Sequence, residues 1–328
     1  MQGYDTFNIS LDKKDRGADI DFVSHAHTDH ISAVKGSKSV LMSDQTASLI
    51  EKVYSIGMGS RRIALPKTVK LINAGHILGS KQLAIEDDEK GEKIIYSGDF
   101  QMGEPLAAEP IEIESADTLI LDSTYPQFGL KFESKEETGQ NLVRWVNEKL
   151  KEGIVIISAY AIGKSQEIIR LMNNAGIVPV ISKKITKASE VYNRYGARLE
   201  FFSAFNGDGE YESALKENFV GITEKDVGEL AIKLHAVYNK RIFTAVATGF
   251  SKLYKFDTDA QFAISDHADF YQRIEYIDSV APKKIYTYGK EASLLTNTLR
   301  RAGYTSEVYN SKVVSAKILV ELDTNELH

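Results

Sequence analysis

The chain has 328 residues, of which 43% are hydrophobic and 26% charged, a balance typical of globular proteins with a sizeable core. It contains no cysteine, which excludes disulfides and thiolate metal sites and favours an intracellular, cytoplasmic protein. The net charge of −6 argues against a broad basic surface that binds duplex nucleic acid, although bound divalent cations can make one cleft positive. The sequence shows neither a signal-peptide pattern nor an apolar run of membrane-spanning length, so we expect a soluble protein without a membrane partner.

From residue 17 to about residue 122 the sequence alternates short strands and short helices. Ser43 is placed to cap a helix that carries Leu49, Ile50 and Val53 on one face. Residues 81–86 and 93–96 are typical of an antiparallel pair joined by a polar turn. Other strands are expected to end at Val23 and to cover 37–42, part of 62–72, and 118–121.

The pattern changes between residues 128 and 255, where apolar strands and longer helices alternate. A capping box over 134–137 begins a helix, and a fully apolar strand follows at 153–157. Further elements are expected as helices at 164–174 and 187–195, strands at 178–181 and 241–247, and a loop at 206–209. Repeated strand–helix alternation predicts a small parallel sheet. We therefore expect a domain over 128–255, inserted into a domain formed by 1–127 and 256–328.

The last part of the chain returns to the first pattern. A strand near residue 261 precedes a helix with Ile274 and Ile277 on one face. The remaining elements are expected as a helix at 291–301 and strands at 284–287, 306–309 and 313–321.

Three histidines and one aspartate fall within six positions near the start of the chain: His25, His27, Asp29 and His30. Residues two apart in an extended chain point the same way, so His25 and His27 can share one metal ion. Asp29 and His30 follow where the chain turns and can hold a second cation. Imidazole and carboxylate ligands suit zinc, manganese or iron. A solvated loop rich in histidine is the alternative.

Similar side chains follow other predicted strands. His76 lies between Gly75 and Gly79, and His267 follows a short apolar strand. Asp99 and Asp122 also come at strand ends, and a carboxylate such as Asp99 can bridge two cations. Taken alone, each residue could be a structural histidine or a turn carboxylate. We interpret the remaining histidines, His235 and His328, as structural.

Gly163, Lys164 and Ser165 connect a buried strand to a helix. Free N–H groups at a helix start attract anions, and Lys164 adds a positive charge, so these residues could bind phosphate. The spacing is not that of a P-loop, and an ordinary strand–helix turn is the alternative.

Combined, these motifs resemble a known superfamily. The sequences His-x-His-x-Asp-His at 25–30, Ala-Gly-His-x-Leu-Gly-Ser at 74–80 and Ser-Gly-Asp at 97–99 are similar to those of the metallo-β-lactamase fold. Residues 122–125, 159–167 and 265–269 resemble its β-CASP branch, which comprises nucleases acting on RNA or DNA. The branch's short DNA-ligase-associated exonucleases are the most similar group in length and motif wording. The resemblance extends over residues 19–290.

The resemblance implies an α/β (α+β) fold, an αββα sandwich with an inserted Rossmann-like β-CASP domain. It implies that His25, His27 and His76 hold one zinc ion, with Asp99 bridging to a second ion held by Asp29 and His30. Asp122 and His267 match the family's catalytic pair, and Asp29 is the third residue expected to act in catalysis.

One position departs from the family pattern. Many members have a histidine in a Val-His-Gly-Glu sequence that completes the second zinc site, whereas this chain has Tyr288 there. A neutral phenol is a poor zinc ligand, so we expect a weaker second site.

The sequence therefore predicts a metal-dependent nuclease for RNA or single-stranded DNA, with exonuclease action favoured and a metal-activated hydroxide as the nucleophile. Zinc is the expected metal, with manganese as another possibility. A catalytically silent nucleic-acid-binding subunit and a small-molecule ester or thioester hydrolase are the alternatives. A homodimer and a processing or repair complex both stay open.

Overall fold

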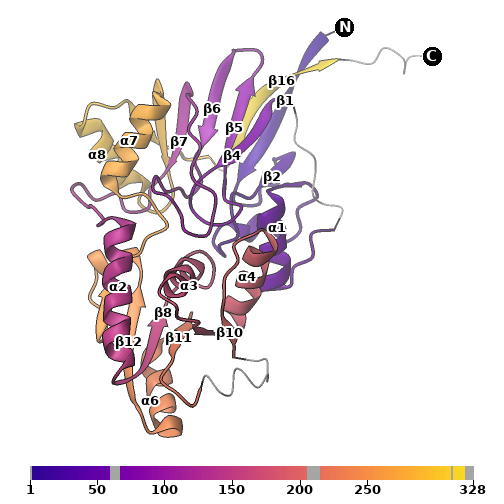
Figure 1. Ribbon diagram of the computed structural model, residues 1–328. Coiled ribbons are helices and arrows are strands. Elements are labelled where there is room, and N and C mark those ends of the chain that lie inside the picture. Colours follow the sequence, from indigo (N-terminus) through magenta and orange to yellow (C-terminus); the bar gives the residue numbers. More distant parts are fainter. Residues whose placement is uncertain (1, 60–66, 205–214, 312, 322–328) are drawn as a thin grey trace.

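The computed structural model describes residues 2–59, 67–204, 215–311 and 313–321 (Figure 1). Its strands form three sheets. The first sheet has the order β16 (Val313–Glu321), β1 (Gln2–Leu11), β2 (Ile20–Phe22) and β3 (Val40–Leu41). The second has the order β15 (Ser306–Val308), β14 (Lys284–Tyr288), β7 (Thr118–Asp122), β6 (Glu92–Tyr96), β5 (Lys81–Asp87) and β4 (Val69–Asn73).

The first two sheets pack face to face through apolar side chains that alternate along their strands. Leu11 and Phe22 of the first sheet share one buried cluster with Leu83, Tyr96 and Ile120 of the second. Helices α7 (Phe270–Val280) and α8 (Ala292–Arg301) cover the other face of the second sheet. Helix α1 (Asp44–Tyr54) packs beyond the first sheet, and the layers therefore follow the expected αββα order.

The third sheet is built only from residues between 153 and 262. Its order is β10 (Phe202–Ser203), β9 (Val180–Ile181), β11 (Val220–Thr223), β8 (Gly153–Ser158), β12 (Arg241–Ala247) and β13 (Ala260–Phe262). All of its neighbouring strands pair in parallel, as expected from the strand–helix alternation. Its helices are α2 (Lys135–Leu150), α3 (Lys164–Asn174), α4 (Lys183–Arg194) and α6 (Val227–Tyr238).

The C-terminal boundary of the inserted region differs from the predicted one. We expected residues from 256 onwards to belong to the outer domain, but β13 pairs with β12 in the third sheet. If the two-domain division is kept as a proposal, its second boundary lies after Phe262. No helix within the described part of the chain is long and apolar enough to cross a membrane.

Several local predictions are confirmed and others are wrong at their ends. Ser43 and Ser134 cap α1 and α2 as expected, with hydroxyls that accept from Thr46 N and Glu137 N at 3.1 Å. Helix α4 begins at Lys183 rather than 187, because Ser182 caps it. The sequence did not reveal β1, which pairs with β16 about 300 residues later. The loop predicted at 206–209, the start of the 62–72 strand and His328 lie outside the described residues.

Candidate metal centre

The predicted ligands lie in loops that follow strands of the two packed sheets. His25, His27 and His30 follow β2, and His76 lies between β4 and β5. Asp99 follows β6, and Asp122 ends β7. His267 precedes α7 and comes from a segment 237 residues beyond His30, yet it joins the same cluster. Strand ends from both sheets thus bring the side chains together.

Four of these side chains form one compact group. Nδ1 of His27 lies 3.1 Å from Nε2 of His25 and 3.1 Å from Nε2 of His76. Oδ2 of Asp99 lies 3.6 Å from Nε2 of His25 and 3.9 Å from that of His76. One ligand atom from each of these four residues lies within 4.8 Å of the others, a grouping that could hold a metal ion.

In each of the three imidazole rings, the nitrogen that points away from the group has a hydrogen-bond partner. Nδ1 of His76 donates to the backbone oxygen of Asp266 at 2.7 Å, and Nε2 of His27 faces that of Ile162 at 3.2 Å. The Ser24 hydroxyl donates to Asp12, so Nδ1 of His25, 2.9 Å from that hydroxyl, is the donor between them. Each ring therefore keeps its proton on the outside. Three lone pairs and one carboxylate then face one another, which is unfavourable unless a cation lies between them.

The titration behaviour of the group agrees with this arrangement. Burial holds the pKa of His25 and His76 well below the ordinary value of 6.5 and also lowers that of His27. The three rings are thus neutral at neutral pH, which is the form that binds metal ions. Burial opposes ionisation of Asp99, but the neighbouring His30 and His267 hold its pKa well below 3.8.

The ligands predicted for a second ion also lie near Asp99. Nε2 of His30 is 3.4 Å from Asp99 Oδ2 and 3.6 Å from Asp29 Oδ2. Nδ1 of His30 is 2.8 Å from Asp12 Oδ2. Burial alone would lower the pKa of His30, but Asp99 and Asp12 outweigh it and raise that pKa well above 6.5. The Asp29 side chain is 78% exposed, so this set is more open than the first.

Tyr288 lines a cleft together with Asp29, His30 and Asp99, but its hydroxyl is directed at the backbone. It donates to the carbonyl oxygen of Leu11 at 3.2 Å, and its ring packs edge-on against Tyr96 at 5.6 Å between centroids. Burial raises the pKa of Tyr288 to about 12, which keeps the phenol neutral. The second set therefore has three protein side chains, Asp29, His30 and Asp99.

Asp122 and His267 lie close to one another and to Asp99. One ligand atom from each of the three residues falls within 4.8 Å of the others. Among the residues that the structure describes, no hydrogen bond joins Asp122 to His267. The Asp122 carboxylate instead accepts from the amide and hydroxyl of Thr124 at 3.0 and 2.9 Å. Burial, followed by the charge of Asp99, raises the pKa of Asp122.

Gly163, Lys164 and Ser165, for which a phosphate role is predicted, already have partners within the protein. Lys164 is only 4% exposed, and its ammonium pairs with Asp266. The amide of Gly163 donates to the Gln166 side chain at 2.7 Å, and the Ser165 hydroxyl donates to the Tyr160 carbonyl at 2.7 Å. These donors at the start of α3 are therefore already satisfied. The turn joins the third sheet to the Asp266 loop, and Lys164 is also among the residues that line the cleft described below, so the phosphate role stays a prediction.

Gly163 is required at this turn. Its φ of +91° favours glycine, and a Cβ there would lie 2.4 Å from Cγ2 of Ile77 and 3.0 Å from Asp266 Oδ2. Ile77 follows His76 in the chain, so this close approach locks α3 against two loops of the metal centre.

We expect Lys164→Met to destabilise the protein by about 3–5 kcal/mol, because it leaves the buried Asp266 carboxylate without its cation. Urea unfolding of metal-free protein measures this loss. Adding Asp266→Asn to Lys164→Met should recover part of it. Unchanged stability together with weaker binding of nucleic acid would instead support the phosphate role.

Sequence reasoning missed three supporting residues. Asp12, after β1, accepts from the Tyr96 hydroxyl at 2.7 Å and from the Ser24 amide at 2.6 Å, besides contacting His30. Arg273 is fully buried on α7 and donates to the backbone oxygens of Asp122 and Thr124. Asp266 is the partner of Lys164. Asp12 could have been found as an aspartate that directly follows a strand, but the sequence did not reveal β1.

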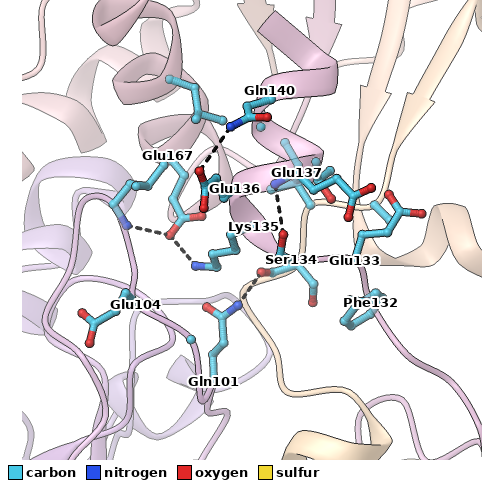
Figure 2. A pocket seen from close by; sticks show the side chains of 18 of the residues that line it. Gln101, Glu104, Phe132, Glu133, Ser134, Lys135, Glu136, Glu137, Gln140 and Glu167 are labelled. Atoms are coloured by element: carbon cyan, nitrogen blue, oxygen red, sulfur yellow. Dashed lines mark hydrogen bonds and ion pairs between the residues drawn. The ribbon is translucent and has the colours of Figure 1, made fainter.

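Two cavities border this part of the molecule. A cleft of about 790 Å³ is lined by His27, Asp29, His30, Asp99, Asp122 and His267, and also by aromatic and lysine side chains. A larger cavity of about 1550 Å³ lies at the start of α2. Figure 2 shows Glu104, Glu136, Glu137 and Glu167 around this cavity. The Glu167 carboxylate forms an ion pair with Lys135. So acidic a lining disfavours phosphates, and the smaller cleft is the candidate substrate site.

The chain was compared with known proteins. No protein-family model matches it. It is 27% identical over 293 residues to a probable DNA ligase from Opitutus terrae, a match that covers 86% of this chain and 28% of that protein. It is 30% identical over 190 residues to an RNase J-like protein from Methanocaldococcus jannaschii, covering 49% of this chain and 44% of that protein. The match thus spans less than half the length of either relative.

A solved structure shares the fold. The crystal structure of a protein of unknown function from Enterococcus faecalis V583 superposes with a TM-score of 0.62 at 14% identity, over 93% of this chain and 83% of that one. The αββα layers, the histidine–aspartate group and the sequence relatives lead to one conclusion. The chain belongs to the β-CASP branch of the metallo-β-lactamase superfamily.

Proposed function

We propose that this protein is a metal-dependent nuclease that hydrolyses phosphodiester bonds in RNA or single-stranded DNA. The observation that carries the proposal is the group of three inward-facing imidazole lone pairs and one carboxylate at the candidate cleft. A silent binding subunit has no need of such a buried group. The lysine and aromatic lining of the cleft supports a nucleic acid over a small ester or thioester.

In this proposal His25, His27, His76 and Asp99 hold the first metal ion, and Asp29, His30 and Asp99 hold a second. Zinc is the expected metal because the ligands are nitrogen and oxygen atoms, and manganese is the other candidate. When bound, such ions supply a nucleophile from water at neutral pH and offset charge on the phosphate. Asp12 contributes by holding the His30 ring through Nδ1.

We assign proton donation to the leaving oxygen to His267. Its ring lies 4.5 Å from that of His76 and lines the cleft, so it can reach a phosphate held at the metal group. Asp122 is the positioning partner of His267. The two side chains are not hydrogen-bonded, so Asp122 acts on the His267 ring through its negative charge. Arg273 holds the Asp122 loop from behind through the two backbone oxygens.

The relatives support nucleic acid as the substrate without choosing one kind. One is described as a probable DNA ligase and another as RNase J-like, so DNA repair and RNA processing are both supported. Exonuclease action and a cytoplasmic location stay part of the proposal. A homodimer and a larger processing or repair complex also remain as proposals.

Metal binding at the second site tests the effect of having Tyr288 where many family members have a histidine. We expect Tyr288→His to raise the affinity for the second zinc ion by roughly 10–100-fold, because the imidazole adds a ligand to an open, three-residue set. Equilibrium dialysis followed by metal analysis gives the number of ions bound per chain. Tyr286→His, two residues earlier on β14 and outside the cleft, is the control. Equal second-site affinity in Tyr288→His and the wild type would show that position 288 does not limit the site.

A digestion time course tests the nuclease proposal. End-labelled single-stranded RNA, single-stranded DNA and duplex DNA are incubated with zinc- or manganese-loaded protein. We expect cleavage of at least one single strand, and the product ladder reports exonuclease or endonuclease action. Intact strands after incubation with fully metal-loaded protein would favour the silent binding subunit.

A further inference from the structure

A row of aromatic rings leads from the metal group to the open end of the cleft. The Tyr125 ring lies 5.9 Å from that of His267, Phe250 lies 5.1 Å from Tyr125, and Tyr254 lies 6.1 Å from Phe250, all between centroids. All four residues line the cleft. Tyr125 is buried, whereas Phe250 is 37% and Tyr254 62% exposed. The row therefore begins beside His267 at the candidate metal centre and ends in a largely exposed ring.

The loop that carries the two outer rings is held firmly. It begins with the short helix η3 (Gly249–Lys252), in which the Thr248 side chain accepts from the Phe250 amide at 3.4 Å. The Phe250 carbonyl then accepts from the amides of Leu253 and Tyr254 at 2.9 and 2.8 Å. These bonds fix the spacing between the Phe250 and Tyr254 side chains.

The loop also approaches Tyr125 closely at Gly249, so a larger residue there would require the Tyr125 side chain to shift. A Cβ on Gly249 would lie 2.6 Å from the Tyr125 hydroxyl oxygen and 3.1 Å from the ring of Phe132. The outer rings thus rest on a buried aromatic base, and they can receive a ligand with little reordering.

The chemistry of the lining identifies the ligand. Lys13, Lys184 and Lys290 line the same cleft and favour an anionic chain. Exposed aromatic rings beside such a chain suit nucleobases, which stack on them regardless of sequence. A base inside a duplex is already paired and stacked, so only an unpaired base can use these rings.

We infer that Phe250 and Tyr254, here called the aromatic platform, stack against unpaired bases of the strand whose phosphate lies at the metal group. This inference rests on the proposed nuclease function and adds to it the residues that hold the strand. It predicts that the protein engages single-stranded segments through their bases as well as through their phosphates.

Binding to intact and abasic strands tests the platform. Metal-loaded protein is titrated against a fluorescent single-stranded DNA with uncleaved phosphorothioate linkages, and against the same strand without bases. We expect Tyr254→Leu to weaken binding of the base-containing strand by roughly 5–100-fold and to change binding of the abasic strand less than about twofold. Tyr254→Phe keeps the ring and should retain most of the binding.

The controls separate the platform from folding and from catalysis. Tyr271→Leu removes a 49% exposed tyrosine outside the cleft and should bind both strands like the wild type. Equal losses on both strands, or no loss for Tyr254→Leu together with Phe250→Leu, would overturn the platform even if the protein cleaves DNA. A base-dependent loss in a protein that cleaves no strand would support the platform and overturn the nuclease proposal. A wild type that binds neither strand would overturn the platform, whereas the digestion of RNA would still test the nuclease proposal.

Discussion

Asp99→Ala is expected to abolish metal binding and nuclease activity together, with the cleavage rate falling about 10³-fold or more. Its Oδ2 lies 3.4 Å from His30, 3.6 Å from His25, 3.8 Å from His267 and 3.9 Å from His76, measured to a ring nitrogen in each case. This carboxylate belongs to both ligand sets, so removing it leaves facing imidazoles without an anionic ligand. Metal analysis and cleavage assays on the same sample measure the two losses.

The matched control is Asp87→Ala. Asp87 is also a buried carboxylate, but it ends β5, where it accepts from the backbone amides of Lys90 at 2.9 Å and Lys317 at 3.2 Å. Its loss should reduce stability and leave the metal content unchanged. If Asp99→Ala kept a full complement of metal, the ligand assignment would be wrong.

His267→Gln is expected to slow cleavage of an oligonucleotide by roughly 10²–10⁴-fold while the metal content stays constant. The reason is that His267 lies beside the four-residue group without belonging to it, and we assign to it the proton for the leaving oxygen. A p-nitrophenyl phosphodiester has a leaving group that needs no proton, so the variant should lose much less activity on it.

The control for this variant is His235→Gln, which changes an exposed histidine on α6 that contacts the backbone of Lys240. It should leave both rates unchanged. A loss of the same size on both substrates would contradict proton donation by His267 and point instead to a role in holding the phosphate.

The sequence indicated which candidate ligands lie close together, because these residues follow short-range rules. His25 and His27 are two residues apart, and each further candidate comes directly after an apolar strand. Strand ends of packed sheets meet at one edge, so the proximity of His76 and Asp99 to the first cluster could be expected. The αββα layers could be expected only through the family resemblance, because the pairing of β1 with β16 joins opposite ends of the chain.

The contacts that the sequence could not predict involve side chains whose partners are distant along the chain. The pairing of Lys164 could not be predicted because its partner, Asp266, lies 102 positions later. The contacts that Thr124 and Arg273 make with the Asp122 loop could not be predicted either, since Arg273 lies 151 positions after Asp122. The aromatic platform was not anticipated, because neither Phe250 nor Tyr254 belongs to a recognisable motif. Burial and orientation decide these roles, and neither can be read from spacing along the chain.

The most direct test of the central claim is a zinc titration of metal-stripped protein, with bound metal and cleavage of a single-stranded oligonucleotide measured in the same samples. The account predicts no cleavage without metal and a rate that rises as His25, His27, His76 and Asp99 fill, with both signals lost in Asp99→Ala. Cleavage by the stripped protein at the full rate, or no cleavage by the fully loaded protein, would contradict it.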